Sequence, residues 1–141
     1  MILKTLALFV ATAAIAIGGE WGTDWEAAKA QAKKENKPIF INFTGTDWCG
    51  WCIKLDKEVF SKDAFKAYAR DNLVLLKLDF PRRKMLPKEK SARNQELAEI
   101  FGIRGFPTIV LLGADGKEKA RTGYQRGGAE AYVEHLKGLL D

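Results

Sequence analysis

The sequence predicts a single α/β domain, and three observations support that prediction. After the first 18 residues, helical and extended patterns alternate along the chain, as they do in α/β proteins. The chain has 141 residues, of which 47% are hydrophobic, and this is the size and composition of one compact domain. It contains no internal repeat and no low-complexity tract, so a second domain is not needed to account for it.

The chain begins with a pattern that predicts a secretory signal peptide at residues 1–18, ahead of a domain at residues 19–141. One positive charge precedes an almost wholly apolar stretch at residues 5–17, and small residues between Ala16 and Glu20 suit cleavage. The stretch is shorter than the roughly 20 residues that a membrane-spanning helix needs, so we expect no stable membrane insertion after cleavage. The alternative is an uncleaved anchor or a buried amino-terminal helix. We therefore expect an exported protein, periplasmic or secreted, in a compartment that permits disulfides.

The domain is expected to open with a helix and a buried strand. The helix should begin at Thr23, because Thr23 and Glu26 form a capping box ahead of alanines at helical spacing. It should end at Asn36, shortly before a proline. Residues 38–43 are short, apolar and rich in isoleucine and phenylalanine, which predicts a buried strand.

The middle of the chain predicts a long helical segment, a strand and a loop. Residues 49–70 have a helical pattern with a break near Ser61, whose side chain can cap a new turn. Residues 73–80 predict the second strand. Residues 81–90 carry two prolines and five basic residues, and this composition predicts a loop.

The last part of the chain predicts a helix, a hairpin and a closing helix. Residues 91–101 form a helical pattern that Gly102 ends. Residues 108–112 and 118–124 predict a hairpin, because an Asp-Gly turn signal lies between them. Residues 130–140 predict an amphipathic helix.

Two cysteines, Cys49 and Cys52, lie where a strand is expected to pass through a turn into a helix. Side chains three residues apart meet on one helix face, so the two sulfurs can form a small, reducible disulfide. Cys49 is the expected nucleophile, because unpaired N–H groups and the dipole at a helix amino terminus favour a thiolate. Cys52 is expected to resolve the mixed disulfide that forms with a partner. Trp48 and Trp51, on either side of Cys49-Gly50, can contact a partner or serve as packing.

Three other uses of two cysteines fit this sequence less well. A structural disulfide would be better placed to close a long loop. A zinc site needs four ligands, and His135 is the one remaining soft candidate. Haem attachment requires a histidine directly after the second cysteine, where this chain has Ile53. We therefore expect no metal and no cofactor other than the redox-active disulfide.

The cysteine motif, followed much later by Gly105-Phe106-Pro107-Thr108, resembles thioredoxin, and the Thr44 to Cys49 lead-in resembles exported bacterial thioredoxin-like proteins. The resemblance covers the chain from about Trp25 onward and implies a central mixed β-sheet flanked by helices. It implies that Pro107 is a cis-proline facing the cysteine pair. It also implies that the backbone of Phe106 pairs with a substrate strand, while the Phe106 ring lines an apolar groove or packs inward.

The chain departs from the thioredoxin pattern at two positions that would support catalysis. Thioredoxin has a buried aspartate in the strand before the motif that assists proton transfer with the resolving cysteine, and this chain has Asn42 there. Asparagine cannot ionise, so resolution must rely on water, Lys77 or another group. Lys77 aligns with a lysine of the thioredoxin central strand, although its amine can equally reach water. Trp51 replaces the usual proline, and no histidine lies between the cysteines, which favours a reductase or isomerase-like exchanger over a strong oxidase.

The function expected from the sequence is thiol-disulfide exchange with protein thiols or disulfides, by a monomer that depends on an unidentified redox partner. The alternative is a thioredoxin-fold binding module that holds extended chains with little redox turnover. The net charge of +5 is too small and too spread for a nucleic-acid binder, so no nucleic-acid partner is expected. The basic segment, with Arg82, Arg83, Lys84 and Lys88, is either a solvated loop or a dock for an acidic partner.

Overall fold

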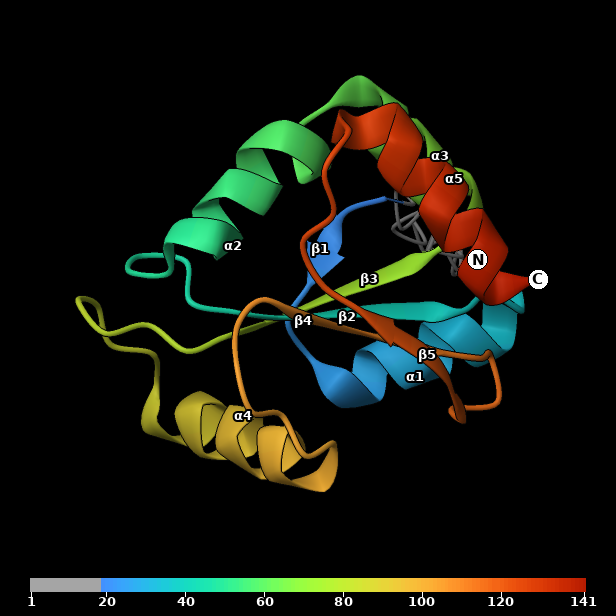
Figure 1. Cartoon of the computed structure of the whole chain (residues 1–141). Coiled ribbons are helices and arrows are strands. Elements are labelled where there is room, and N and C mark those ends of the chain that lie inside the picture. Colours follow the sequence, from blue (N-terminus) through green and yellow to red (C-terminus); the bar gives the residue numbers. More distant parts are fainter. Residues whose placement is uncertain (1–18) are drawn as a thin grey trace, which may run out of the picture.

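The computed structural model describes residues 19–141, which form a five-stranded sheet with helices on both faces (Figure 1). The strands are β1 (Trp21–Gly22), β2 (Ile39–Thr44), β3 (Val74–Asp79), β4 (Thr108–Leu112) and β5 (Glu118–Thr122). Their order across the sheet is β1-β3-β2-β4-β5. β3 is parallel to both β1 and β2, whereas β4 is antiparallel to β2 and to β5. The predicted mixed α/β sheet is therefore confirmed, and the expected leader lies outside the described residues.

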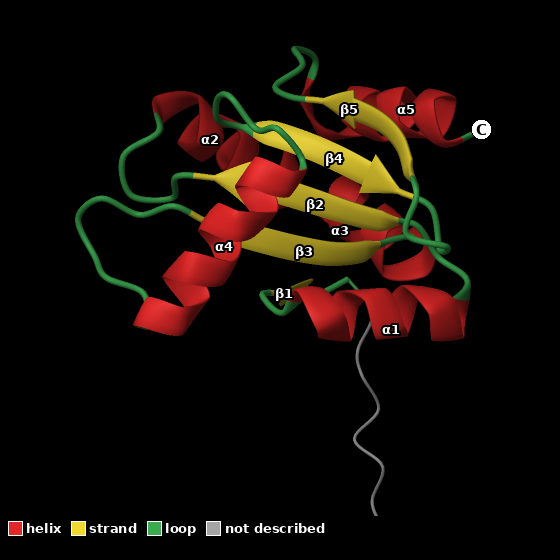
Figure 2. Cartoon of the chain, turned by 90° about the horizontal axis from the view of Figure 1, so that it is seen from below, coloured by secondary structure: helices red, strands yellow, loops and turns green. Residues whose placement is uncertain are grey.

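The helices divide between the two faces of the sheet, and Figure 2 shows α1 and α4 in front of it. They are α1 (Trp25–Glu35), α2 (Gly50–Leu55), the π-helix η1 (Asp56–Phe60), α3 (Asp63–Asn72), α4 (Lys88–Ile100) and α5 (Gly128–Leu140). α1 and α4 share one hydrophobic cluster with the sheet, and α2, η1, α3 and α5 share the other. All residues of β2 are buried because helices cover both faces of this central strand.

The helix that carries the cysteines is anchored through its second half. η1 continues α2 directly, and the side chains of Leu55, Val59 and Phe60 are buried in the cluster beneath them. A π-helical turn inside a longer helix is often found close to a functional site. The buried second half thus holds the amino terminus of α2 close to the carboxyl end of the central strand β2.

Two predicted caps are wrong, for local reasons. α1 begins at Trp25, and its N-cap is Asp24, whose Oδ1 accepts the N–H of Ala27 at 2.9 Å, instead of Thr23. Both residue types cap well, so the sequence pattern did not separate neighbours. The predicted break at Ser61 is confirmed, but Ser61 donates its hydroxyl to the Lys57 carbonyl at 2.9 Å and does not cap α3.

Other boundaries shift by a few residues, and one strand escaped prediction. α4 begins at Lys88, three residues before the expected start, and α5 begins at Gly128. The hairpin of β4 and β5 is confirmed, with Gly116 at a φ of +83° in its turn. β1 is too short to show a periodic pattern; in the structure, the Trp21 ring packs 5.3 Å from that of Phe60. None of the helices within residues 19–141 is long and apolar enough to cross a bilayer.

Candidate active site

Cys49 and Cys52 form a disulfide at the amino terminus of α2, with their Cα atoms 5.2 Å apart. Cys49 is the N-cap of this helix, and its Sγ accepts the backbone N–H of Cys52 at 3.3 Å. An N–H group aimed at this sulfur, together with the helix dipole, favours its anionic form once the disulfide is reduced. Exposure is 6% for Cys49 and 4% for Cys52, so only a small part of the pair lies at the surface.

Trp48 fastens the turn before the cysteines to the end of β3. Its indole Nε1–H donates to the carbonyl of Phe80 at 2.7 Å, and the indole is half-buried. A side chain at Gly45 would collide with this indole, so the close approach requires glycine at that position. Sequence reasoning offered partner contact or packing for Trp48, and the structure places its half-buried ring under the Arg82 guanidinium, whose carbon lies 3.5 Å from the ring centroid.

The Phe106–Pro107 peptide bond is cis, as the resemblance implies. The Phe106 ring meets the Trp48 ring edge-on at 5.8 Å and lies 5.1 Å from the Phe80 ring. The partly buried Phe106 ring thus packs against the hydrophobic cluster that the sheet shares with α1 and α4. Its backbone precedes β4, which begins at Thr108, and so lies outside the ladder of the described sheet.

Trp51 lies on the other side of the motif and is 55% exposed. Its ring is 5.1 Å from that of Tyr124, and the ammonium of Lys54 lies 5.0 Å from the Trp51 ring. The Tyr124 hydroxyl donates to Glu58 at 2.5 Å, and this hydrogen bond to a carboxylate raises the pKa of Tyr124. Tyr124 and Glu58 were missed from sequence because they join segments 66 residues apart. The adjacent rings of Trp51 and Tyr124, here called the exposed aromatic step, lie next to Gly50. A Cβ atom added at Gly50 would meet open space, so the backbone there is accessible.

A cavity of about 660 Å³, lined mostly by residues with polar side chains, lies on the inner side of Cys52. It brings the two predicted supporting residues together, because Asn42 on β2 is paired in register with Lys77 on β3. Asn42 is 4% exposed, and its Oδ1 has no hydrogen-bond partner among the described residues. Asp56 also lines the cavity, one helical turn after Cys52. Sequence reasoning did not single out Asp56, although the four-residue spacing was a usable signal.

The lysine of the cavity has a second contact. The Lys77 ammonium lies 5.4 Å from the Trp21 ring on the edge strand, which is a cation–π distance. His135, the other residue weighed for chemistry, lies elsewhere, with its Nε2 2.7 Å from the Thr122 hydroxyl. The described residues therefore gather Asn42, Lys77 and Asp56 near Cys52, and keep the histidine apart.

In a comparison with known families, residues 25–137 match the thioredoxin-like domain. Among curated proteins, the chain is 40% identical over 119 residues to the disulfide bond reductase DsbH of Chlamydia pneumoniae, covering 82% of this chain and 72% of that protein. It is 32% identical over 117 residues to the thiol:disulfide interchange protein DsbD of Yersinia enterocolitica, covering 81% of this chain but only 18% of that much longer protein.

Solved structures give the same fold. A structure described as DsbH oxidoreductase matches with a TM-score of 0.81 and 38% identity, covering 86% of this chain and 83% of that one. A thioredoxin from Thermus thermophilus matches with a TM-score of 0.64 at 18% identity, over 86% of each chain. At that identity the second match speaks for the fold alone.

Proposed function

The chain belongs to the thioredoxin-like family and is a thiol-disulfide oxidoreductase, and on that premise we propose that it is an exported reductase of protein disulfides. The observation that carries the proposal is the contact between the Cys49 sulfur and the Cys52 N–H at the start of α2. This contact stabilises a thiolate at Cys49, and a thiolate is the attacking species in disulfide exchange. The name of the Chlamydia relative, a disulfide bond reductase, supports the direction of electron flow.

The first step is attack on a client disulfide. The Cys49 thiolate bonds to one client sulfur, the client S–S bond breaks, and the second client sulfur leaves as a thiolate that takes up a proton. In the proposal, the client segment contacts Trp48, Gly50 and Trp51 around the cysteines, and pairs with the backbone of Phe106 beside Pro107. The exposed aromatic step and the open backbone at Gly50 support this placement.

The second step is resolution by Cys52. Its thiol loses a proton, and its sulfur attacks Cys49, which releases the client as a dithiol and leaves the protein disulfide. The electrons move through the two sulfurs, so the proposal needs no metal or organic cofactor. Because Asn42 cannot accept the proton, we assign that role to water in the cavity, with Lys77 and Asp56 as the ionisable groups that face it.

The cellular setting is part of the proposal. The leader pattern at residues 1–18 supports export to a periplasm or beyond the cell, where client disulfides occur. A reductase in such a compartment must itself be reduced, so we propose a redox partner that delivers electrons to the Cys49–Cys52 disulfide. We propose that the protein acts as a monomer, with no nucleic-acid partner.

The test is reduction of insulin by dithiothreitol with catalytic amounts of the protein. We expect acceleration by the protein and none by Cys49→Ser, because serine does not form a disulfide with the client. The matched control is Ser61→Ala, which removes a hydroxyl remote from the cysteines and should keep the activity. Equal activity of Cys49→Ser and the unchanged protein would contradict the assignment of the nucleophile.

A further inference from the structure

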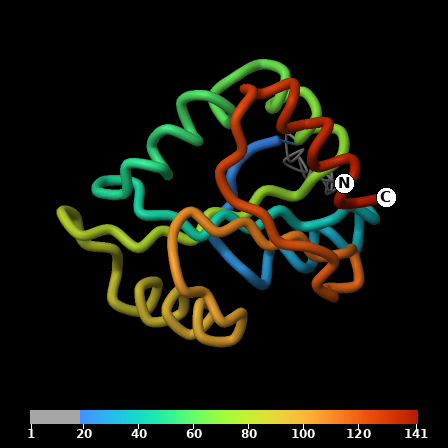
Figure 3. Tube along the Cα trace, in the orientation of Figure 1, coloured from blue at the N-terminus to red at the C-terminus, as the bar shows by residue number. Residues whose placement is uncertain are grey.

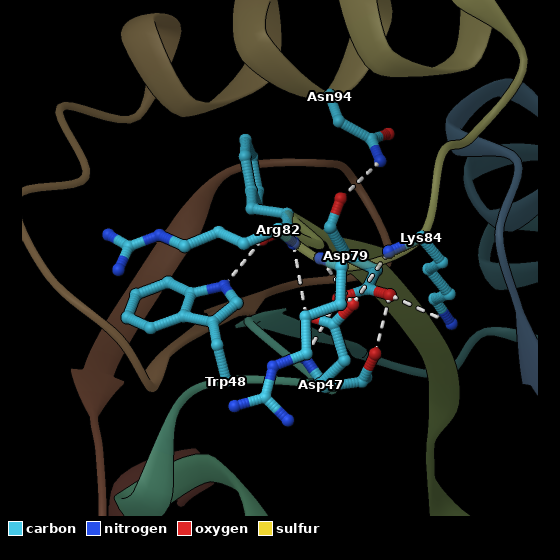
Figure 4. Close-up of polar contacts among 9 residues, drawn as sticks. Asp47, Trp48, Asp79, Arg82, Lys84 and Asn94 are labelled. Atoms are coloured by element: carbon cyan, nitrogen blue, oxygen red, sulfur yellow. Dashed lines mark hydrogen bonds and ion pairs between the residues drawn. The ribbon is translucent and has the colours of Figure 1, made fainter.

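The segment between β3 and α4, residues 81–87 and here called the basic loop, is tied to the turn that carries the cysteines. Asp47 accepts the backbone N–H groups of Arg82, Arg83 and Lys84 at 3.0, 2.9 and 3.0 Å (Figure 4). These bonds, with that of Arg82 first, hold the pKa of Asp47 below its usual value. Figure 3 shows the loop and the turn side by side at the same end of the molecule. The basic loop thus has a fixed position beside the site.

Arg82 brings positive charge directly to the active-site tryptophan. Its guanidinium carbon lies 3.5 Å from the centroid of the Trp48 ring, which is a stacked cation–π contact. Stacking uses the flat face of the guanidinium, so its N–H edge remains able to bind a carboxylate through two hydrogen bonds. Trp48 is the residue before Cys49, and the charge therefore sits next to the nucleophile in the chain.

Two acids beside the basic loop, Asp79 and Asp47, are already engaged by other groups. The Asp79 carboxylate accepts the Thr46 N–H at 2.9 Å and the Thr46 hydroxyl at 2.7 Å, and lies 3.4 Å from the Lys84 ammonium. Asp47 is engaged by backbone N–H groups. Within residues 19–141, no salt bridge involves Arg82 or Arg83, and both side chains are exposed. The loop therefore presents positive charge that the described residues do not neutralise.

We propose that the basic loop selects clients whose disulfide is flanked by acidic residues. A client carboxylate binds Arg82 and Arg83 while the client sulfur lies at Cys49, and the neighbouring Met85, 96% exposed, adds an apolar contact. Charge complementarity at the rim of a site acts mainly by raising the rate of productive encounter. The inference rests on the proposed disulfide reduction, and adds the class of client that is reduced fastest.

The test uses two synthetic peptides, each closed by one internal disulfide. They are identical except that aspartate flanks the cysteines in one and serine flanks them in the other. The reduced protein is mixed with each peptide, samples are acid-quenched, and peptide thiols are counted by alkylation. Each turnover converts one protein dithiol and one peptide disulfide into one protein disulfide and one peptide dithiol, so no further reductant is needed. The measured quantity is the acidic preference, the ratio of the two second-order rate constants.

We expect an acidic preference of about tenfold at about 0.01 M salt, where the screening length is about 30 Å. It should fall towards one near 1 M salt, and also in the double variant Arg82→Gln, Arg83→Gln. Arg83→Gln alone should lower it without removing the contact to Trp48. The charge-matched control is Lys33→Gln, Lys34→Gln, in the last turn of α1, which should keep the preference.

The outcomes distinguish client selection by the basic loop from the disulfide reduction on which it rests. Equal rates for the two peptides, or an equal loss of preference in the α1 control, would overturn selection by the basic loop and leave disulfide reduction standing. Failure of the unchanged protein to reduce either peptide would overturn both proposals. A preference for the acidic peptide that disappears with salt and in the arginine variants supports the inference.

Discussion

The disulfide lies between two polar regions that differ in how completely their polar groups are paired. The outer side is the turn at Asp47 and Trp48 with the basic loop, and the inner side is the cavity next to Cys52. On the outer side, Asp47 accepts three N–H groups and the Trp48 indole donates to the Phe80 carbonyl. On the inner side, Asn42 and Asn94 line the cavity, and their buried amide oxygens have no partner among the described residues. The outer side is therefore held in one shape, whereas the cavity on the inner side is lined by the ionisable side chains of Lys77 and Asp56, which can exchange protons with water.

The largest effect that tests this comparison comes from placing an acid on the inner side. Asn42→Asp puts a carboxylate at a 4% exposed position, where burial should raise its pKa above the usual value. The raised pKa makes the folded state lose stability as pH rises from about 4 to the folded-state pKa. We expect a loss of about 2 to 3 kcal/mol at pH 8 relative to pH 4, measured by urea unfolding.

The same variant should also alter resolution, because the new carboxylate can accept the Cys52 proton through water in the cavity. The rate of release of a client from the mixed disulfide should gain the pH dependence of the new carboxylate, in addition to that of the Cys52 thiol, which the unchanged protein also has. Asn42→Leu has a similar size and no ionisable group, and serves as the control. If Asn42→Asp and Asn42→Leu gave the same pH profile, the inner side would have no part in proton exchange.

A smaller effect is expected from breaking one contact on the outer side. Trp48→Phe removes the indole N–H and leaves the Phe80 carbonyl without its donor, which should cost about 1 to 2 kcal/mol of unfolding free energy. Trp51→Phe is the matched control, because Trp51 is 55% exposed and no hydrogen bond of its indole is present among the described contacts. Denaturant unfolding should show a clearly smaller change for Trp51→Phe, and equal changes would mean that the outer hydrogen bond carries no stability.

The smallest and most local effect is expected at Asp47. Asp47→Asn weakens the acceptor for the basic loop, and amide exchange at Arg83 and Lys84 should quicken by about tenfold. Because the pKa of Asp47 is lowered, the same loosening in the unchanged protein should appear only at a more acidic pH than an ordinary aspartate would give, as the pH falls through the folded-state pKa. Asp71→Asn, on the exposed side of α3, is the control, and exchange that stays slow in Asp47→Asn would contradict the anchoring role.

The difference between the two sides also explains which features of the fold and of the site could be predicted from the sequence. The cysteine pair, β2 and the Asp-Gly hairpin follow from short-range patterns, and each lies where it was expected. The contacts of Asp47 and Trp48 join residues 32 to 37 positions apart, and no local pattern signals them. β1 has two residues and no period, and the choice between Thr23 and Asp24 as a cap depends on geometry that both residue types allow. Local order was thus predictable, and the links between segments were not.

The central claim is that Cys49 attacks the client and Cys52 resolves, and covalent trapping tests it most directly. Cys52→Ala, mixed with insulin or with the serine-flanked peptide, should accumulate a mixed disulfide through Cys49 that dithiothreitol releases. Cys49→Ala should accumulate none, because it is the Cys49 sulfur that accepts a backbone N–H at the N-cap of α2 and is stabilised there as a thiolate. A stable adduct on Cys49→Ala, or none on Cys52→Ala, would contradict the account.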